Sequence, residues 1–175
     1  MRLRPLLVLG LALGASLLAA SPARAFCGSY VARAAQNRGD EVLCLSRTKG
    51  PVGRHIPWDA ASETPDLQGV ELVIHCAAAV GDYRPGSAEE ANQVAVNVHG
   101  TRRLLEAAAT AGSQVVIVSS ASVYDTRRNR DRMTEEHPTE AGHLNAYGAT
   151  KAMADRAALA AGAGAIAGIV AMGPA

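Results

Sequence analysis

Short apolar segments alternate with helical patterns along most of the chain, and this alternation is the feature that most constrains its fold. Four runs, at 41–46, 55–58, 72–75 and 114–119, are mostly apolar and short enough to be strands buried on both faces of a sheet. Helical patterns lie between and after them, most clearly at 88–111 and 146–160, and a weaker strand candidate follows at 166–170. The alternation predicts an open α/β fold with a parallel sheet.

The composition excludes several classes of protein. A chain of 175 residues has room for one domain of ordinary size, and a second full domain does not fit. The 17 Lys and Arg residues nearly balance the 16 Asp and Glu residues, and aromatic residues make up only 3%. A surface that binds nucleic acid needs positive charge or stacking aromatic rings, so we expect no nucleic-acid partner.

The cysteines and histidines do not have the spacing of metal ligands. The three cysteines, Cys27, Cys44 and Cys76, are widely separated, and the five histidines form no helical His-x-x-x-His pair. We interpret the cysteines as small buried apolar residues and expect no metal site.

Two segments near the end of the chain combine residues that can transfer a proton. Ser119 ends the predicted strand 114–119 and Ser120 follows it directly. Tyr147 and Lys151 lie four positions apart on the helix 146–160, so their side chains share one helical face. A phenol is a poor base at neutral pH, and a nearby cation favours its phenolate. Tyr-x-x-x-Lys alone occurs often by chance on exposed helix faces, but here it follows Ser-Ser-Ala-Ser-Val-Tyr at 119–124.

With this pair of motifs, residues 26–161 resemble the nucleotide-binding half of an NAD(P)-dependent epimerase/dehydratase of the extended short-chain dehydrogenase/reductase family. The resemblance implies a Rossmann-type, doubly wound parallel sheet with strand order 3-2-1-4-5-6 and NAD or NADP as cofactor. It also implies that Tyr147 is the general acid/base, that Lys151 holds the nicotinamide ribose as well, and that Ser120 hydrogen-bonds the reacting oxygen.

Three further segments match the family. His75-Cys76-Ala77-Ala78-Ala79 resembles its H-x-A-A motif, in which small residues such as Ala77 and Ala78 let the dinucleotide lie against the backbone; a plain buried strand end is the alternative. Asn97, in a segment resembling N-V-x-G-T, is more typical of a structural or water-holding residue than of a catalytic one. Asp59 lies where the family often has an acid near the adenine, although a solvated loop explains it equally well.

The sequence indicates the preferred cofactor and the type of reaction less clearly than it indicates the family. A carboxylate directly after the strand 41–46 would favour NAD, but the chain has Arg47 there. Arg47 would either accept a 2′-phosphate and favour NADP or simply face water. Sugar dehydratases of the family have an Asp-Glu pair where this chain has Ala121 and Ser122, so elimination of water is disfavoured. The resemblance also implies a substrate domain after residue 170, for which the chain has no counterpart.

The amino end supports two interpretations. Arg2 and Arg4 precede an apolar run at 6–20, and Ala-Arg-Ala follows at 23–25, as in a secretion signal. Aligned without gaps, residues 21–25 replace the family's glycine-rich turn, so that Pro22 and Ala25 stand where glycines approach the pyrophosphate and only the third glycine, Gly28, remains.

A shifted reading frame would explain this segment, because codons for Val-Thr-Gly-Ala-Ser read one base later can encode Ser-Pro-Ala-Arg-Ala. We therefore divide the chain into a signal-like or frame-shifted segment, 1–25, and a partial NAD(P)-binding domain, 26–175, whose first strand is doubtful.

The sequence thus predicts an NAD(P)-dependent oxidoreductase or epimerase that acts on a nucleotide sugar, a sterol or a similar hydroxyl or carbonyl compound and is impaired in this chain. The alternatives are an exported, non-catalytic protein built on a decayed Rossmann fold and a nucleotide-sensing regulator. We expect a cytoplasmic protein that has a small-molecule substrate and no membrane partner and that can form a homodimer. A genuine signal at 1–25 would instead make it secreted.

Overall fold

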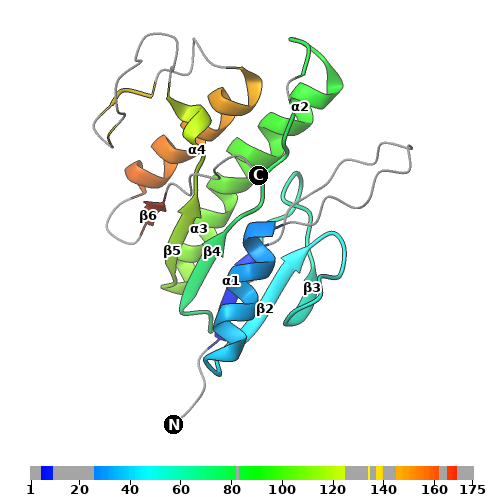
Figure 1. The fold of residues 1–175 in the computed structure, drawn as a ribbon, viewed down its shortest axis with the longest axis vertical. Helices are drawn as coiled ribbons and strands as arrows, with labels where there is room; N and C mark the ends of the chain where they lie inside the picture. Colours follow the sequence, from blue (N-terminus) through cyan, green and yellow to red (C-terminus); the bar gives the residue numbers. More distant parts are fainter. Residues whose placement is uncertain are drawn as a thin grey trace.

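A six-stranded parallel sheet forms the centre of the molecule (Figure 1). The computed structural model describes residues 5–9, 26–81, 83–124, 134, 137–139, 145–161 and 165–168. The strands, β1 to β6 in chain order, are Pro5–Leu9, Glu41–Ser46, Arg54–Pro57, Leu72–His75, Gln114–Val118 and Ala165–Gly168. Their order in the sheet is β3-β2-β1-β4-β5-β6, and every neighbouring pair is parallel, as the doubly wound fold predicts.

Helices cover both faces of this sheet. α1 (Phe26–Asn37) lies on the near face in Figure 1, and its Ala32 and Ala35 pack against Val42 of β2. The opposite face is covered by α2 (Ala88–Val94), a π-helical segment η1 (Ala95–Gly100), α3 (Thr101–Ala111) and α4 (Ala146–Ala160). There Leu104 of α3 packs with Val73 and Ile117 in the main core, and each of these three side chains is fully buried. Burying such a side chain stabilises the fold by about 1.5–3 kcal/mol.

The predicted elements agree with the observed ones except at a few ends. β2, β4 and α4 have the predicted bounds, whereas β3 begins and ends one residue earlier than predicted. β6 begins one residue and ends two residues earlier than the predicted strand 166–170. β5 ends at Val118 instead of residue 119, because Ser120 is already the N-cap of the short 3₁₀ helix η2 (Ala121–Val123). The predicted helix 88–111 is a single run, but it includes the π turn η1 around Asn97.

The first strand, which the sequence left in doubt, is β1 at the centre of the sheet. Leu7 pairs with Leu43 of β2 and with Val73 of β4, so this strand joins the two halves of the sheet. The ungapped alignment required a strand immediately before residue 21, whereas β1 ends at Leu9. Residues 5–9 of the signal-like segment therefore belong to the folded domain. The predicted turn at 21–25 lies outside the described residues.

A close approach between a helix and a loop positions the segment after β3. A Cβ atom added to Gly100 would lie 2.5 Å from the carbonyl oxygen of Ala60, so only glycine fits there. The loop with Trp58 and Asp59 is thereby packed against the helical run. Among the described residues, no helix has both the length and the apolar character needed to cross a membrane.

Candidate active site

The candidate residues lie at the carboxyl ends of the strands, where parallel α/β sheets bind their ligands. Ala77 and Ala78 follow β4 and are buried, and Ser119 and Ser120 follow the neighbouring strand β5. α4 begins beside them because the side chain of Asn145 caps it, with Asn145 Oδ1 accepting a hydrogen bond from the Gly148 N–H at 2.8 Å. This cap places Tyr147 in the first turn of α4.

Ser120 and Tyr147 lie close enough for the Ser120 hydroxyl to lower the pKa of the Tyr147 phenol. The Ser120 hydroxyl also accepts a hydrogen bond from the Ser122 N–H at 3.2 Å, which fixes its orientation at the start of η2. Burial raises the pKa of the half-buried Tyr147 phenol, the Ser120 hydroxyl lowers it, and the negative charge of Asp155 raises it further. The net direction is upward, so Tyr147 is a neutral phenol at neutral pH.

Lys151 is buried, and its ammonium is engaged by the strand end. Lys151 Nζ donates a hydrogen bond to the carbonyl oxygen of Val118 at 2.7 Å, and only 4% of the residue is exposed. Burial lowers the pKa of Lys151, while Asp155 and Cys76 oppose this shift. From the sequence we expect Lys151 to lower the pKa of Tyr147. In the structure the pKa is instead raised, because burial and Asp155 together raise the pKa of the phenol.

Asp155 is a buried acid at this site that the sequence patterns did not reveal. Its Oδ2 accepts a short hydrogen bond from the Ser119 hydroxyl, whereas its buried Oδ1 has no hydrogen-bond partner. Burial raises the pKa of Asp155, and Ser119, Lys151 and Arg156 oppose that shift. Its spacing of four from Lys151, which continues the spacing between Tyr147 and Lys151, was the signal in the sequence that could have identified it.

The surroundings of His75, at the end of β4, indicate a structural role. Its Nε2 lies 3.0 Å from the Thr101 hydroxyl, and the ring is 1% exposed. Burial and, to a lesser extent, the charge of Lys151 lower the pKa of His75 to about 3. The imidazole is therefore neutral at physiological pH and lies within the core.

Asn97 connects the segment after β4 to α4. Its Oδ1 accepts a hydrogen bond from the Ala79 N–H at 2.7 Å, and its Nδ2 donates to the Ala79 carbonyl and to the Thr150 hydroxyl, each at 3.0 Å. These bonds hold the Ala77–Ala79 backbone next to the helix that contains Tyr147 and Lys151. The π turn η1 at Asn97 coincides with this connection.

The other candidate cofactor residues lie along the same edge of the sheet. Gly28 is buried in the first turn of α1, and Arg47 is exposed directly after β2. Asp59 is half-buried after β3, and its carboxylate accepts a hydrogen bond from the Ala61 N–H at 2.9 Å, so it stabilises its own turn. Gly10, which follows β1 directly in the chain, and Pro22 and Ala25 lie outside the described residues.

Ser120, Tyr147 and Lys151 fit a nicotinamide ribose better than a metal ion. An ammonium has three donors, and the Val118 carbonyl takes one of those on Lys151. Ala77 and Ala78, which follow the neighbouring strand β4, have small side chains and are buried. Within the residues that the structure describes, no group of three or more His, Cys, Asp or Glu residues has a metal-binding arrangement.

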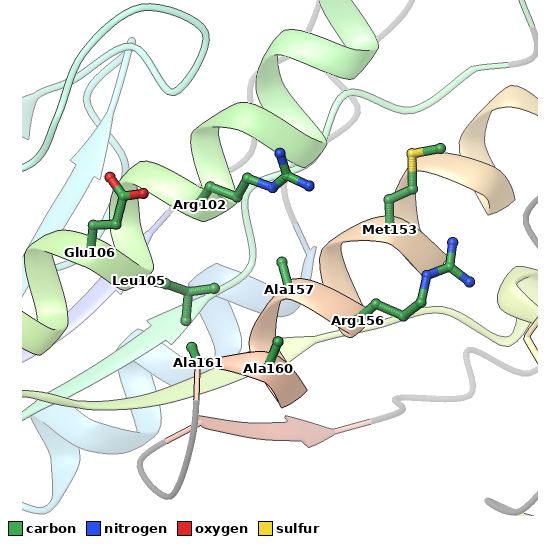
Figure 2. Close-up of a pocket in the computed structure, with 8 residues that line it drawn as sticks. All are labelled: Arg102, Leu105, Glu106, Met153, Arg156, Ala157, Ala160 and Ala161. Carbon is green, nitrogen blue, oxygen red and sulfur yellow. The ribbon is translucent and has the colours of Figure 1, made fainter.

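Two surface hollows lie elsewhere on the molecule. Figure 2 shows the first, of about 460 Å³, between α3 and the second half of α4. It is lined by Arg102, Leu105, Glu106, Met153, Arg156, Ala157, Ala160 and Ala161. The second, of about 580 Å³, lies in the segment from Tyr83 to Glu89. Neither hollow is lined by Ser120, Tyr147 or Lys151.

Comparison with known proteins agrees with this geometry. The family described as NAD dependent epimerase/dehydratase matches residues 23–173. The chain is 33% identical to MoeE5, solved in complex with UDP-glucose and NAD, over 83% of this chain and 50% of that chain, with a TM-score of 0.69. It is 28% identical to a short-chain dehydrogenase/reductase superfamily protein from Agrobacterium tumefaciens with bound NAD, over 94% of this chain and 48% of that chain, with a TM-score of 0.70.

A third solved structure is DesIV, a dTDP-glucose 4,6-dehydratase from Streptomyces venezuelae with NAD and TYD bound. It is 26% identical over 89% of this chain and 51% of that chain, with a TM-score of 0.67. The chain thus spans about half the length of the solved structures that it matches. No curated protein matches the chain.

Proposed function

Since the chain belongs to the NAD dependent epimerase/dehydratase family, we propose that it serves NAD-dependent oxidation, reduction or epimerisation of a nucleotide sugar. The observation that supports this proposal best is the proximity of Ser120, Tyr147 and the buried Lys151 at the carboxyl end of β5. NAD is the cofactor present in the MoeE5, Agrobacterium and DesIV structures, and UDP-glucose is present with it in MoeE5. In this proposal the nucleotide-binding unit comprises β1 together with residues 26–175.

Each of the three residues has a separate role in the proposal. Because its pKa is raised, the Tyr147 phenol is protonated in the free chain and is suited to donate its proton to a carbonyl oxygen. The Ser120 hydroxyl hydrogen-bonds the same oxygen, and the Lys151 ammonium binds the ribose hydroxyls with donors that Val118 leaves available. NAD, when bound, supplies the site that gives or accepts the hydride.

Elimination of water is not part of the proposal. Ala121 and Ser122 form the exposed helix η2 after Ser120, and neither has a carboxylate that could remove or deliver a second proton. This separates the proposed reaction from that of a dehydratase such as DesIV. Oxidation or reduction with NAD requires only the single proton of Tyr147 besides the hydride.

The proposal also includes the compartment of the protein and its oligomeric state. The compartment is the cytoplasm, since removal of residues 1–25 as a secretion signal would take β1 out of the centre of the sheet. Homodimer formation stays a prediction that analytical ultracentrifugation of the purified chain would test.

The proposal is tested by incubating the chain with NAD and either UDP-glucose or dTDP-glucose while recording the absorbance of the reduced nicotinamide. In this direction Tyr147 has to accept the proton of the sugar hydroxyl, and its raised pKa leaves little phenolate to do so. We therefore expect slow reduction of NAD, and none with the Tyr147→Phe variant. Reduction at the same rate in that variant would contradict the assignment. NAD binding with neither net reduction of NAD nor an epimerised sugar in either protein would instead favour a nucleotide-sensing regulator.

A further inference from the structure

Three side chains on one face of α4 hold three consecutive residues at the end of β5. Tyr147, Lys151 and Asp155 are spaced by four and therefore lie one above another along the helix. Tyr147 lies beside Ser120, which lowers the pKa of its phenol, Lys151 donates to the Val118 carbonyl, and Asp155 accepts from the Ser119 hydroxyl. The strand end is thus attached to the helix at every residue from 118 to 120.

The first two of these attachments involve proposed site residues, whereas Asp155 has no role in the proposed reaction. Asp155 is 9% exposed, and its Oδ1 is buried without a hydrogen-bond partner. A buried carboxylate with an unsatisfied oxygen is costly unless a positive charge compensates it. An amide or hydroxyl side chain would bind Ser119 without that cost, so attachment of the strand alone does not explain an acid here.

The compensating charge available on α4 is Lys151, one turn before Asp155. Each of the two groups opposes the effect of burial on the other: Asp155 raises the pKa of Lys151, and Lys151 lowers that of Asp155. Cys76 also acts on Lys151, in the same direction as Asp155. Lys151 in turn helps to lower the pKa of His75, which is neutral. Arg156, on the same helix, acts on Asp155 as well.

We propose that Asp155 is a positioning residue, which keeps Lys151 charged inside the protein and, through Ser119, holds Ser120 opposite Tyr147. This role rests on the proposed function of Lys151 and Tyr147. Asp155 itself touches neither the reacting oxygen nor the cofactor. Ser119 has a supporting role, because its hydroxyl stabilises the ionised form of the Asp155 carboxyl.

The chain offers a direct test because it contains only two lysines, Lys49 and Lys151. Lysine labelled with ¹³C at Cε then gives two NMR signals, and the exposed Lys49 serves as the internal reference. The titration midpoint of each signal is compared between the wild-type chain and Asp155→Asn, which keeps the shape of the side chain and an acceptor for Ser119. We expect the Lys151 midpoint to move to lower pH while the Lys49 midpoint stays in place.

An unchanged Lys151 midpoint in Asp155→Asn would overturn the proposal and leave Asp155 as a packing residue. If that variant does not fold, Asp155→Ser decides the question, because it removes the charge while its hydroxyl can still bond Ser119. A Lys151 midpoint below the wild-type value supports the proposal, and an unchanged one overturns it. The titration needs neither NAD nor substrate, so its outcome is independent of whether the chain binds NAD.

Discussion

At the scale of single residues, Tyr147 and Lys151 have separable tasks. Tyr147→Phe removes the proton donor and little contact area, so we expect turnover to fall by about 10²–10⁴-fold while NAD affinity stays nearly unchanged. Lys151→Ala removes a buried cation that bonds the Val118 carbonyl, and it should reduce both turnover and NAD affinity. Steady-state kinetics and calorimetric titration of the two variants measure these effects. Equal loss of NAD affinity in both variants would show that this division of roles is wrong.

His75 makes the stability of the fold depend on pH in one direction. Its pKa is lowered from 6.5 to about 3 in the folded chain, so between these values the unfolded chain binds the proton that the folded chain excludes. The His75 contribution to stability is therefore fully present above pH 6.5 and is lost as the pH falls toward 3, by up to about 1.4 kcal/mol per pH unit.

Urea unfolding of the wild-type chain and of His75→Gln at several pH values tests this dependence. Above pH 6.5 the difference in unfolding free energy between the two proteins should be constant, and it should shrink as the pH is lowered. A difference that is independent of pH would show that His75 is not kept neutral by burial.

The residues also differ in how far sequence could predict them. The meeting of Ser120 with Tyr147 follows from a strand end and a helix start that the sequence marks locally. Asp155 was missed because its environment depends on burial against β5, which the pattern of α4 alone does not encode. The direction of the Tyr147 pKa shift was missed for the same reason, since it results from burial and from Asp155.

At the scale of elements, β1 is the strand on which the sheet depends. Leu7 lies between Leu43 and Val73, so Leu7→Pro removes a backbone N–H from the central strand and should lower the melting temperature strongly or prevent folding. Arg54→Pro is the matched control, because Arg54 is the first residue of the edge strand β3 and proline is tolerated there.

Thermal unfolding followed by circular dichroism compares these two variants. Similar melting temperatures for Leu7→Pro and the wild-type chain would show that Pro5–Leu9 is not part of the folded sheet. In that case the whole of residues 1–25 would again be compatible with a removable signal.

The elements could largely be predicted, because buried parallel strands and capped helices have local signatures. The sequence alone was ambiguous for β1, since a short apolar run after two arginines is equally typical of a secretion signal and of a central strand. Pairing with β2 and β4 resolves this ambiguity, and such long-range pairing cannot be read from a local pattern.

At the scale of the whole molecule, cofactor binding depends on the connection between β1 and α1. Strand β1 ends at Leu9 and α1 begins at Phe26, so residues 10–25 stand where the family has a short glycine-rich turn. Within this segment Gly10 and Gly14 are followed by Pro22 and Ala25 before Gly28. We expect the chain to bind NAD weakly, because Pro22 offers no N–H to a phosphate and Ala25 stands where the family has a glycine.

We therefore expect the connection between β1 and α1 to limit the affinity for NAD, and we expect this affinity to depend on Lys151 as well. Replacing residues 10–25 by Gly-Ala-Ser-Gly, which leaves β1 and α1 unchanged, should raise NAD affinity by restoring a glycine turn at the start of α1. Lys151→Ala in the shortened protein should remove much of this gain, whereas Tyr147→Phe should keep it.

The most direct measurement is isothermal titration of NAD into four proteins: the chain, the shortened chain, and the shortened chain with either Lys151→Ala or Tyr147→Phe. Titration with NADP in parallel shows whether Arg47 selects the phosphorylated cofactor. We expect weak binding to the chain, tighter binding to the shortened chain and to its Tyr147→Phe variant, and a loss of affinity with Lys151→Ala. Absence of binding to the shortened chain, or binding unaffected by Lys151→Ala, would contradict the assignment of this edge of the sheet as the cofactor site.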